Sequence, residues 1–304
     1  MKNKKIIIGS RGSKLALIYA ERARAELLKN SEIESIDIKR ITTTGDTIID
    51  KRLSEHGGKG LFCKTIEKEL LNDNIDIAIH ALKDLPTDET EGLLTNCFLE
   101  RNDPREILIS KKNNLLKNLP AGSLVGTSSF RREFQIKKIR EDLNCKLIRG
   151  NVDTRIQKLN NDFYDAIVLA YAGINSLGLT QKISQVFSTS EIIPSAGQGV
   201  VALQCRKDDK DIINILDKVN HQNTHNCIKA ERNVLKVLEG DCETAVGVFA
   251  SVDRNIINLE AELFSLDGKQ RFHLKSSKEL DRADELGIEI GKELKRVSNN
   301  SYKK

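Results

Sequence analysis

The fold class can be read from residues 4–29, KKIIIGSRGSKLALIYAERARAELLK. Lys4–Ile8 predicts a short apolar strand. Ser13 is suited to cap a helix that runs to about Lys29, with Leu15 and Ile18 among its apolar positions. A strand followed closely by such a helix begins a βαβ pattern, which is typical of α/β proteins.

The same alternation continues to residue 80. Ile36–Thr43 predicts a second strand, and the loop GGKG (residues 57–60) precedes an amphipathic helix between Leu61 and Leu71. Asp76–His80 predicts a compact third strand. The resulting βαβαβ pattern indicates a mostly parallel sheet with right-handed crossovers.

The pattern restarts after a polar linker, Glu100–Pro104. The expected strands are Glu106–Ile109, Ser123–Val125, Lys146–Ile148 and Asp165–Ala170, and the expected helices are Ser129–Glu141 and Asp153–Leu159. On the first helix we expect Phe130, Phe134 and Ile139 to be buried. A second flexible segment, Ser195–Gly199, indicates a chain that leaves one α/β domain, builds a similar one and returns.

The last third has a different character. A helix is expected at Thr224–Leu238, followed by strands at Val246–Val252, Ile256–Phe264 and Gln270–Leu274 and a helix at Lys278–Val297. These elements predict a small α+β domain. The expected limits are therefore 1–99 with 197–218 for the first α/β domain, 105–194 for the second and 222–304 for the C-terminal domain.

The composition excludes several classes of protein. The 49 basic and 44 acidic residues leave a net charge of only +5, which does not indicate nucleic-acid binding. Aromatic residues make up 4% and Trp is absent, so a base-stacking surface is not expected. No segment approaches the ~20 apolar residues of a membrane span, and the N-terminus lacks the apolar region of a signal peptide. We expect a soluble, cytoplasmic protein without nucleic-acid or membrane partners.

The six cysteines are expected to be free thiols. They form no CxxC motif and no cluster with histidine, so no metal site is expected. Cys242 lies just past the end of a predicted helix and should be accessible, but its acidic neighbours do not favour a preactivated thiolate. From the residues alone, Cys242 is more simply interpreted as structural.

Polar side chains follow the predicted strands, where ligands bind in open α/β sheets. They are Ser10, Arg11 and Ser13, then Lys83 and Asp84, then Thr127, Ser128, Ser129, Arg131 and Arg132, then Arg149, Gly150, Asn151 and Arg155. Five arginines fall within residues 131–155, and arginine is a good bidentate ligand for carboxylate or phosphate. The set predicts a cleft for a polyanionic small molecule, although a solvated basic helix face would give the same spacing.

Asp84 is the single acid among these residues. A carboxylate at this position can act as a general acid or base, or can stabilise a developing cation. The simpler alternative is a loop aspartate that caps a turn before Pro86.

Several segments resemble the porphobilinogen deaminase (hydroxymethylbilane synthase) family. The matching segments are IHALKDLP (residues 79–86), GTSSFRR (126–132), RGNVDTR (149–155), GQG (197–199) and Glu231-Arg232 with Gly240-Asp241-Cys242. The resemblance covers nearly the whole chain. It implies two α/β domains like those of periplasmic binding proteins and a C-terminal domain that carries the cofactor cysteine.

The resemblance also implies the reaction. Members of the family join four porphobilinogen molecules head to tail, release ammonia at each step and form hydroxymethylbilane for haem biosynthesis. The chain grows on a dipyrromethane primer, which is held through a thioether to a cysteine, here Cys242. The resemblance implies a cytoplasmic transferase, which we expect to be a monomer.

The family pattern assigns roles to residues of this chain. Asp84 is expected to be the catalytic group, which also contacts the cofactor. The other expected cofactor contacts are Cys242, Lys83, Thr127, Ser129, Arg131, Arg132 and Arg155. The expected substrate contacts are Arg11, Ser13, Lys59 and Arg149. The chain departs from the usual pattern at Thr44, Ala81, Ser176, Asp241 and Ala245.

Two other functions remain open at this stage. Two α/β domains with two crossings suit a non-enzymatic small-anion-binding protein equally well, because a fold does not determine a function. Such a binder would need neither Asp84 nor Cys242. The arginine cluster could instead bind nucleic acid, but the near-balanced charge and the few aromatic residues argue against it.

Overall fold

The computed structural model describes residues 4–43, 60, 62–239 and 244–303. These residues form two compact units. The first takes in the described residues of Met1–Ile48, Gly57–Asn102 and Gly199–His225, and the second takes in those of Asp103–Gln198 and Asn226–Lys304. The chain thus leaves the first unit, builds a complete sheet in the second, and returns to finish the first.

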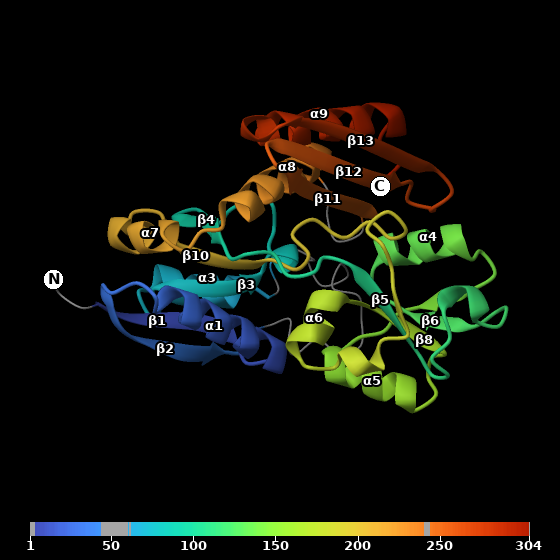
Figure 1. Cartoon of the computed structure of the whole chain (residues 1–304), viewed down its shortest axis with the longest axis horizontal. Coiled ribbons are helices and arrows are strands. Elements are labelled where there is room, and N and C mark those ends of the chain that lie inside the picture. Colours follow the sequence, from blue (N-terminus) through green and yellow to red (C-terminus); the bar gives the residue numbers. More distant parts are fainter. Residues whose placement is uncertain (1–3, 44–59, 61, 240–243, 304) are drawn as a thin grey trace. The chain divides into compact units, whose positions relative to one another are not determined.

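The first unit contains a five-stranded sheet (Figure 1). Its order is β2 (Ile33–Ile41), β1 (Lys4–Arg11), β3 (Ile77–Ala81), β10 (Val201–Arg206) and β4 (Leu93–Phe98). Strand β1 is parallel to β2 and β3, whereas β10 is antiparallel to β3 and β4. The three strands of the predicted βαβαβ segment are parallel to one another, as expected, and four of the five strands run in one direction. The sheet is mixed because the returning segment enters it as β10 in the opposite direction to β3.

Helices cover both faces of this sheet. Because successive side chains of a strand point to opposite faces, Ile6 and Ile8 pack with α1 (Lys14–Leu27) and α7 (Lys210–Asp217). Ala78, on the other face of β3, packs with α3 (Lys64–Leu71). The sheet is thereby held rigid behind the loops that follow β1 and β3.

The second unit repeats this plan. Its sheet has the order β7 (Asn144–Lys146), β6 (Leu124–Gly126), β8 (Ala166–Ala170), β5 (Glu106–Ser110) and β9 (Gln185–Val186). Strand β6 is parallel to β7 and β8, and β5 is antiparallel to β8 and β9, as at the equivalent places in the first sheet. One face packs with α4 (Phe130–Ile139), the other with α5 (Val152–Asn160) and α6 (Tyr171–Ser176). The prediction of two similar α/β domains is confirmed.

Helix α4 buries a different face from the one expected. Its buried side chains are Arg131, Arg132, Gln135 and Ile136. Phe130 and Phe134 are only partly buried, and Ile139 is 40% exposed. The prediction is wrong because polar partners in the interior receive the arginines, as described below, while Phe134 packs on Phe264 of the C-terminal sheet, with ring centroids 5.7 Å apart.

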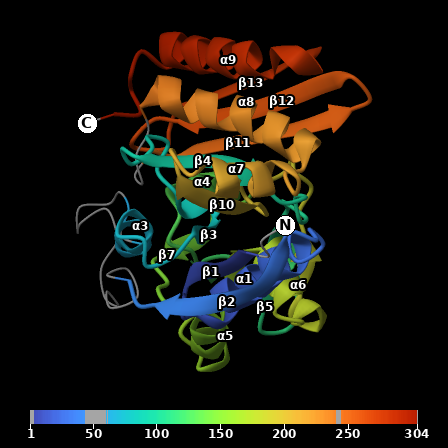
Figure 2. The ribbon, with the colours of Figure 1, turned by 90° about the vertical axis from the view of Figure 1, so that its left-hand side faces the viewer.

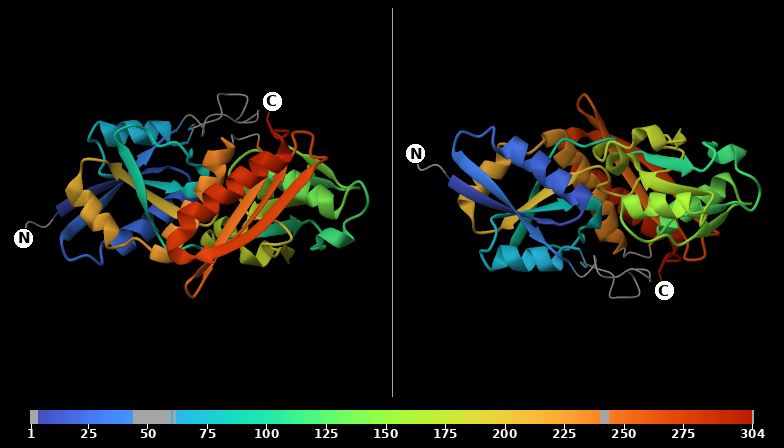
Figure 3. Two further views of the ribbon diagram at one scale, coloured as in Figure 1. Left: turned by 90° about the horizontal axis from the view of Figure 1, so that it is seen from above. Right: turned by 90° about the horizontal axis from the view of Figure 1, so that it is seen from below.

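The C-terminal part of the second unit is a three-stranded antiparallel sheet. Its strands are β11 (Val246–Asp253), β12 (Ile256–Phe264) and β13 (Arg271–Glu279). Helices α8 (Gln222–Leu238) and α9 (Ala283–Ser298) share its apolar core (Figure 2). Gly287 permits a close approach of these helices, because a Cβ there would lie 2.2 Å from the Ala230 carbonyl oxygen. Figure 3 shows α9 running along the sheet, so the expected α+β domain is confirmed.

Short 3-10 turns link several of these elements. They are η2 (Leu82–Asp84), η3 (Leu116–Asn118), η4 (Thr180–Lys182) and η5 (Leu280–Arg282). Turn η2 follows β3 directly, and so it fixes the position of Asp84 at the carboxyl end of a central strand.

Candidate active site

The first unit contains a pocket at the carboxyl ends of β1 and β3. Its polar lining consists of Arg11, Ser13, Cys63, His80 and Asp84. Phe62, Ala81 and four apolar side chains from β3 and α1 complete the lining. Three of the predicted site residues, Arg11, Ser13 and Asp84, therefore lie in one pocket, as the rule for open α/β sheets leads one to expect.

Asp84 is exposed in this pocket. Its carboxylate makes no hydrogen bond or ion pair within the part of the chain that the structure describes. The alternative of a turn-capping aspartate finds no support there. Its neighbour Lys83 is also exposed and lies outside the pocket lining. An exposed carboxylate without an internal partner can accept or donate a proton at a bound molecule.

Arg11 and Ser13 are held by their own surroundings. The Arg11 guanidinium carbon lies 4.1 Å from the centroid of the Phe62 ring, a favourable cation–π contact. The Ser13 hydroxyl accepts a hydrogen bond from the Ala16 amide at 3.4 Å and so caps α1, as predicted. Arg11 therefore presents its charge at the N-terminal end of a helix, where anions are favoured.

The reasoning from sequence missed Phe62 and His80 as members of this pocket. His80 lies within the stretch IHALKDLP (residues 79–86) and Phe62 lies within the helix predicted between Leu61 and Leu71, but neither residue type indicated a role there. His80 is buried at the end of β3, and its Nε2 lies 3.2 Å from Gln204 Oε1. Burial lowers the pKa of His80 to about 4, so the imidazole is neutral at neutral pH.

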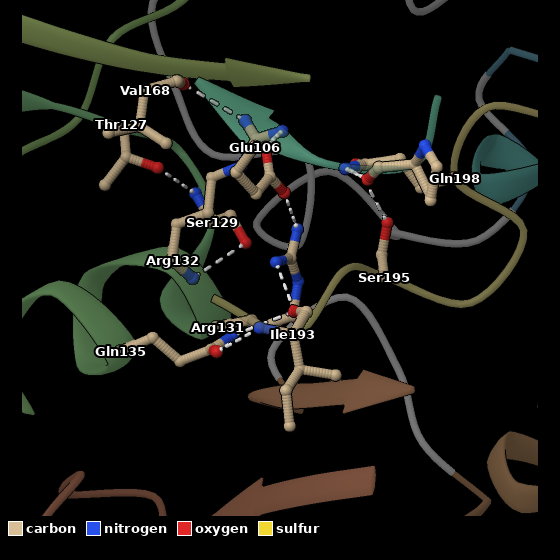
Figure 4. Close-up of polar contacts among 11 residues, drawn as sticks. Glu106, Thr127, Ser129, Arg131, Arg132, Gln135, Val168, Ile193, Ser195 and Gln198 are labelled. Carbon is tan, nitrogen blue, oxygen red and sulfur yellow. Dashed lines mark hydrogen bonds and ion pairs between the residues drawn. The ribbon is translucent and has the colours of Figure 1, made fainter. Parts of the chain in front are cut away.

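In the second unit, hydroxyl groups cap the turn that leads into α4. The Ser129 amide donates to Thr127 Oγ1 at 3.2 Å, and the Arg132 amide donates to Ser129 Oγ at 3.4 Å (Figure 4). Thr127 is buried, and Ser129 is partly exposed. These bonds fix the N-terminus of α4, which begins with Phe130 and carries both Arg131 and Arg132 in its first turn.

Arg131 and Arg132 share one buried carboxylate. Glu106 is fully buried, and its two oxygens lie 2.7 Å from Arg131 Nη2 and 2.8 Å from Arg132 Nη2 (Figure 4). Arg131 also donates to the Ile193 carbonyl at 2.8 Å, and Arg132 donates to the Val168 carbonyl at 3.2 Å. The alternative of a solvated basic helix face is wrong for these two residues, since both are nine-tenths buried.

This cluster contains two buried cationic groups and one buried donor without a described partner. Two guanidinium groups face the single Glu106 carboxylate, and Arg132 Nε is buried without a hydrogen-bond partner in the described part of the chain. Burial lowers the pKa of Arg131, and Glu106 opposes this effect. A buried donor without a described partner favours a ligand with an acceptor group, such as a carboxylate.

The loop after β7 and the helix α5 that follows it contribute one further arginine each. Arg149 is half-buried, its Nε is buried without a partner among the described residues, and burial lowers its pKa. Arg155 Nε donates to the Gly150 carbonyl at 2.8 Å from the first turns of α5, which Asn151 caps. Gly150 has φ +114°, a conformation that suits glycine, so this turn brings both arginines close to a helix N-terminus.

Two predicted site residues, Lys59 and Cys242, lie outside the residues that the structure describes. Among those it does describe, no group of three or more histidine, cysteine or acidic side chains is arranged to hold a metal ion. Likewise, no described helix is long and apolar enough to cross a membrane.

The fold and the charged side chains described above already define a class of protein. The chain is an α/β protein in which cationic and hydroxylic side chains follow the strands of two sheets and one carboxylate stays exposed among them. The family model for the porphobilinogen deaminase dipyrromethane cofactor binding domain matches residues 6–214, and the model for the C-terminal domain of that enzyme matches residues 225–296. The chain belongs to the porphobilinogen deaminase family.

Curated relatives agree along nearly the whole length. Porphobilinogen deaminase of Syntrophomonas wolfei is 42% identical over 288 residues, 94% of either chain. That of Staphylococcus carnosus is 42% identical over 293 residues, 96% of this chain and 93% of the relative. A probable amino-acid ABC transporter extracellular-binding protein from Bacillus subtilis is similar over 72% of this chain and 90% of its own, with 13% identity and a TM-score of 0.42. The strand orders given above establish the fold class without this last likeness.

Proposed function

We propose that the chain is a porphobilinogen deaminase, which condenses four porphobilinogen molecules head to tail into hydroxymethylbilane and releases ammonia at each step. The observation that carries the proposal is the pocket of the first unit, where the exposed Asp84 carboxylate lies with Arg11 and Ser13 in a member of this family. A simple anion-binding site gains nothing from an exposed carboxylate, whereas a reaction that forms cations and moves protons does.

The charge of the site suits this substrate. Each porphobilinogen carries an acetate and a propionate, so a growing chain gains two carboxylates with every unit. We assign Arg11, Ser13, Lys59 and Arg149 to contacts with the incoming substrate or the growing chain. Arg149 supports this role because its buried Nε has no partner among the described residues, and a carboxylate would satisfy it.

The residues present fit a dipyrromethane cofactor, which carries four carboxylates. Arg131 and Arg132 are buried cations beside Glu106, and the buried Arg132 Nε has no acceptor among the described residues. The residues that would hold the cofactor are Lys83, Asp84, Thr127, Ser129, Arg131, Arg132 and Arg155. When bound, the dipyrromethane supplies the free pyrrole α-carbon to which the first substrate is joined.

We assign the covalent attachment of the cofactor, through a thioether, to Cys242. Four of the other five cysteines are poorly suited to it. Burial raises the pKa of Cys63 to about 12 and that of Cys205 to about 11, and it also raises the pKa of Cys97 and Cys145. A thiol that resists ionisation is a weak nucleophile.

Asp84 would act at three points of each condensation. It donates a proton to the departing amine while the bond between carbon and nitrogen breaks, and its charge then stabilises the cation that remains. After the new carbon–carbon bond forms, the carboxylate accepts the α-proton that the pyrrole ring loses. Each cycle thus returns Asp84 to its starting state, with ammonia as the released product.

The direct test is turnover of porphobilinogen by the purified protein. We expect one ammonia released for each porphobilinogen consumed, and a linear tetrapyrrole by mass spectrometry. Cys242→Ser is the control and should lose turnover. Porphobilinogen that is bound and recovered unchanged would contradict the proposal and favour a small-anion-binding protein.

The proposal also covers the location and the oligomeric state of the protein. We infer a cytoplasmic transferase that acts as a monomer in tetrapyrrole biosynthesis. The free, largely buried thiols support a reducing compartment. Sedimentation of the active protein tests the oligomeric state, and a mass of twice 34.1 kDa would contradict a monomer.

A further inference from the structure

A buried chain of polar side chains ends at the Asp84 pocket. Thr90 Oγ1 donates to Glu67 Oε2 at 2.9 Å, Gln204 Nε2 donates to Glu67 Oε1 at 3.2 Å, and Gln204 Oε1 lies 3.2 Å from His80 Nε2. The side chains of Glu67, Gln204 and His80 are all more than nine-tenths buried. His80 is the member that lines the pocket, whereas Glu67 and Gln204 lie behind it.

The direction of these hydrogen bonds decides the tautomer of His80. The Glu67 carboxylate accepts from Gln204, so the amide of Gln204 must point its nitrogen toward Glu67 and its oxygen toward His80. An amide oxygen only accepts, and therefore the proton of the imidazole lies on Nε2. The other nitrogen, Nδ1, is left as an acceptor, and it has no hydrogen-bond partner in the described part of the chain.

The surroundings keep this imidazole uncharged. Burial is the main effect and lowers the pKa of His80, and Arg11 across the pocket acts in the same direction. Glu67 of α3 and Asp84 of η2 act in the opposite direction but do not compensate for burial. A neutral His80 forms no charged pair with Asp84, so the pocket contains a carboxyl group and a separate neutral acceptor.

We propose that His80 is a further substrate-binding residue, whose Nδ1 accepts a hydrogen bond from an N–H group of porphobilinogen, and that Gln204 and Glu67 are positioning residues that hold it in that tautomer. The inference rests on the proposed function for the identity of the substrate. Porphobilinogen carries N–H donors on its ring and on its aminomethyl group. A neutral acceptor recognises such a donor and leaves Asp84 free for proton transfer.

Two substitutions of His80 test the roles of its two ring nitrogens separately. In His80→Gln the terminal amide reaches the place of Nε2 and can still donate to Gln204, but no acceptor remains at the place of Nδ1. In His80→Asn the amide oxygen lies near the place of Nδ1, but the bond to Gln204 is lost. The two variants therefore test substrate binding and internal support independently.

Steady-state kinetics of the holoenzyme with porphobilinogen give the first readout. We expect His80→Gln to lose about 10- to 100-fold in kcat/KM, mainly through KM, with an unfolding midpoint close to that of the wild type. His80→Asn should keep more of kcat/KM while its unfolding midpoint falls. A kcat/KM of His80→Gln within twofold of the wild type would overturn the proposal.

The tautomer itself is the second readout, and it does not depend on activity. The chain has only five histidines, so ¹⁵N spectra of histidine-labelled protein are simple, and His80→Gln assigns the signal of His80. We expect a protonated Nε2 and an unprotonated Nδ1 at pH 7, and a loss of that preference in Glu67→Gln, because Gln204 can then turn its amide. A protonated Nδ1 in the wild type would overturn the proposal.

The two proposals fail in different ways. A wild-type protein that does not consume porphobilinogen would overturn the proposed function, whatever the spectra show. Normal wild-type turnover with unchanged kinetics in His80→Gln would overturn the role of His80 alone.

Discussion

The Asp84 pocket of the first unit and the Glu106 cluster of the second (Glu106 with Arg131 and Arg132) each lie at the sheet edge where the parallel strands end, yet they are built in opposite ways. Asp84 is exposed and makes no hydrogen bond within the described residues. In the Glu106 cluster the carboxylate is fully buried and Arg131 is only 5% exposed. The group proposed to react is thus kept apart from the core, whereas the arginines proposed to hold the cofactor are part of it. Substitution of Asp84 should therefore affect chemistry alone, whereas substitutions in the Glu106 cluster should affect stability as well.

The largest effect is expected at Asp84. Asp84→Asn keeps the shape of the side chain but removes its charge and its proton transfer, so turnover should fall about 10²- to 10⁴-fold. The unfolding midpoint should stay close to that of the wild type, because Asp84 has no internal partner among the described residues. Ammonia release and urea unfolding measure the two quantities, and the cofactor should remain attached. Turnover near the wild-type rate would refute the role of Asp84.

Substitution of Glu106 in the second unit should, by contrast, lower the stability of the fold. Glu106→Gln leaves two buried guanidinium groups without their carboxylate, which we expect to lower the free energy of unfolding by about 3–5 kcal/mol. Urea denaturation measures this loss. Glu293→Gln removes one member of an exposed ion pair with Arg296 and is the matched control, with little change expected. Equal stability of the two variants would remove the distinction between the regions.

His80 should make the stability of the folded chain depend on pH. The unfolded chain binds a proton at His80 near the ordinary pKa of 6.5, but the folded chain does so only near pH 4. Stability should therefore be complete above about pH 6.5 and fall as the pH decreases toward 4, by about 3 kcal/mol from this residue. Urea denaturation between pH 4 and pH 8 tests this, with His80→Gln as the reference that lacks it. Parallel curves for the two proteins would contradict the neutral state of His80.

The smallest effect is expected at Arg149, and the comparison is with Arg131 in the same unit. Arg149→Leu removes a side chain without a described partner, so we expect normal stability, complete cofactor loading and a KM raised about tenfold, or about 1.4 kcal/mol. Arg131→Leu, by contrast, breaks the contacts with Glu106 and Ile193 and should impair both stability and cofactor assembly. Intact mass, denaturation and kinetics of both variants provide the comparison. Full loading in Arg131→Leu would contradict its assigned role.

Local signals in the sequence were sufficient for part of the structure. Ser13 and Ser129 mark helix starts because a capping hydroxyl acts on the amides of the next few residues, and both caps are present. Ligands of open α/β sheets bind beyond the carboxyl ends of the strands, and this rule also predicted that Arg11 and Asp84 would lie together. The two residues do lie in one pocket, because the ends of neighbouring parallel strands meet.

The rest depends on partners that are distant in the sequence. Helix α4 buries Arg131 and Arg132 because Glu106 and the Ile193 and Val168 carbonyls receive them, and the helix sequence contains no sign of those partners. Strands β4 and β10 were not predicted, and the pairing of β10 with β3 makes the sheet mixed. The polar chain behind His80 joins residues up to 137 positions apart, as between Glu67 and Gln204.

The most direct test of the account is the intact mass of the denatured, purified protein beside that of Cys242→Ser. We predict that the wild-type chain carries the added mass of a two-pyrrole unit and that the variant does not. This result would establish the covalent primer and, with it, the deaminase function. An unmodified wild-type chain that also gains no mass during incubation with porphobilinogen would contradict the central claim.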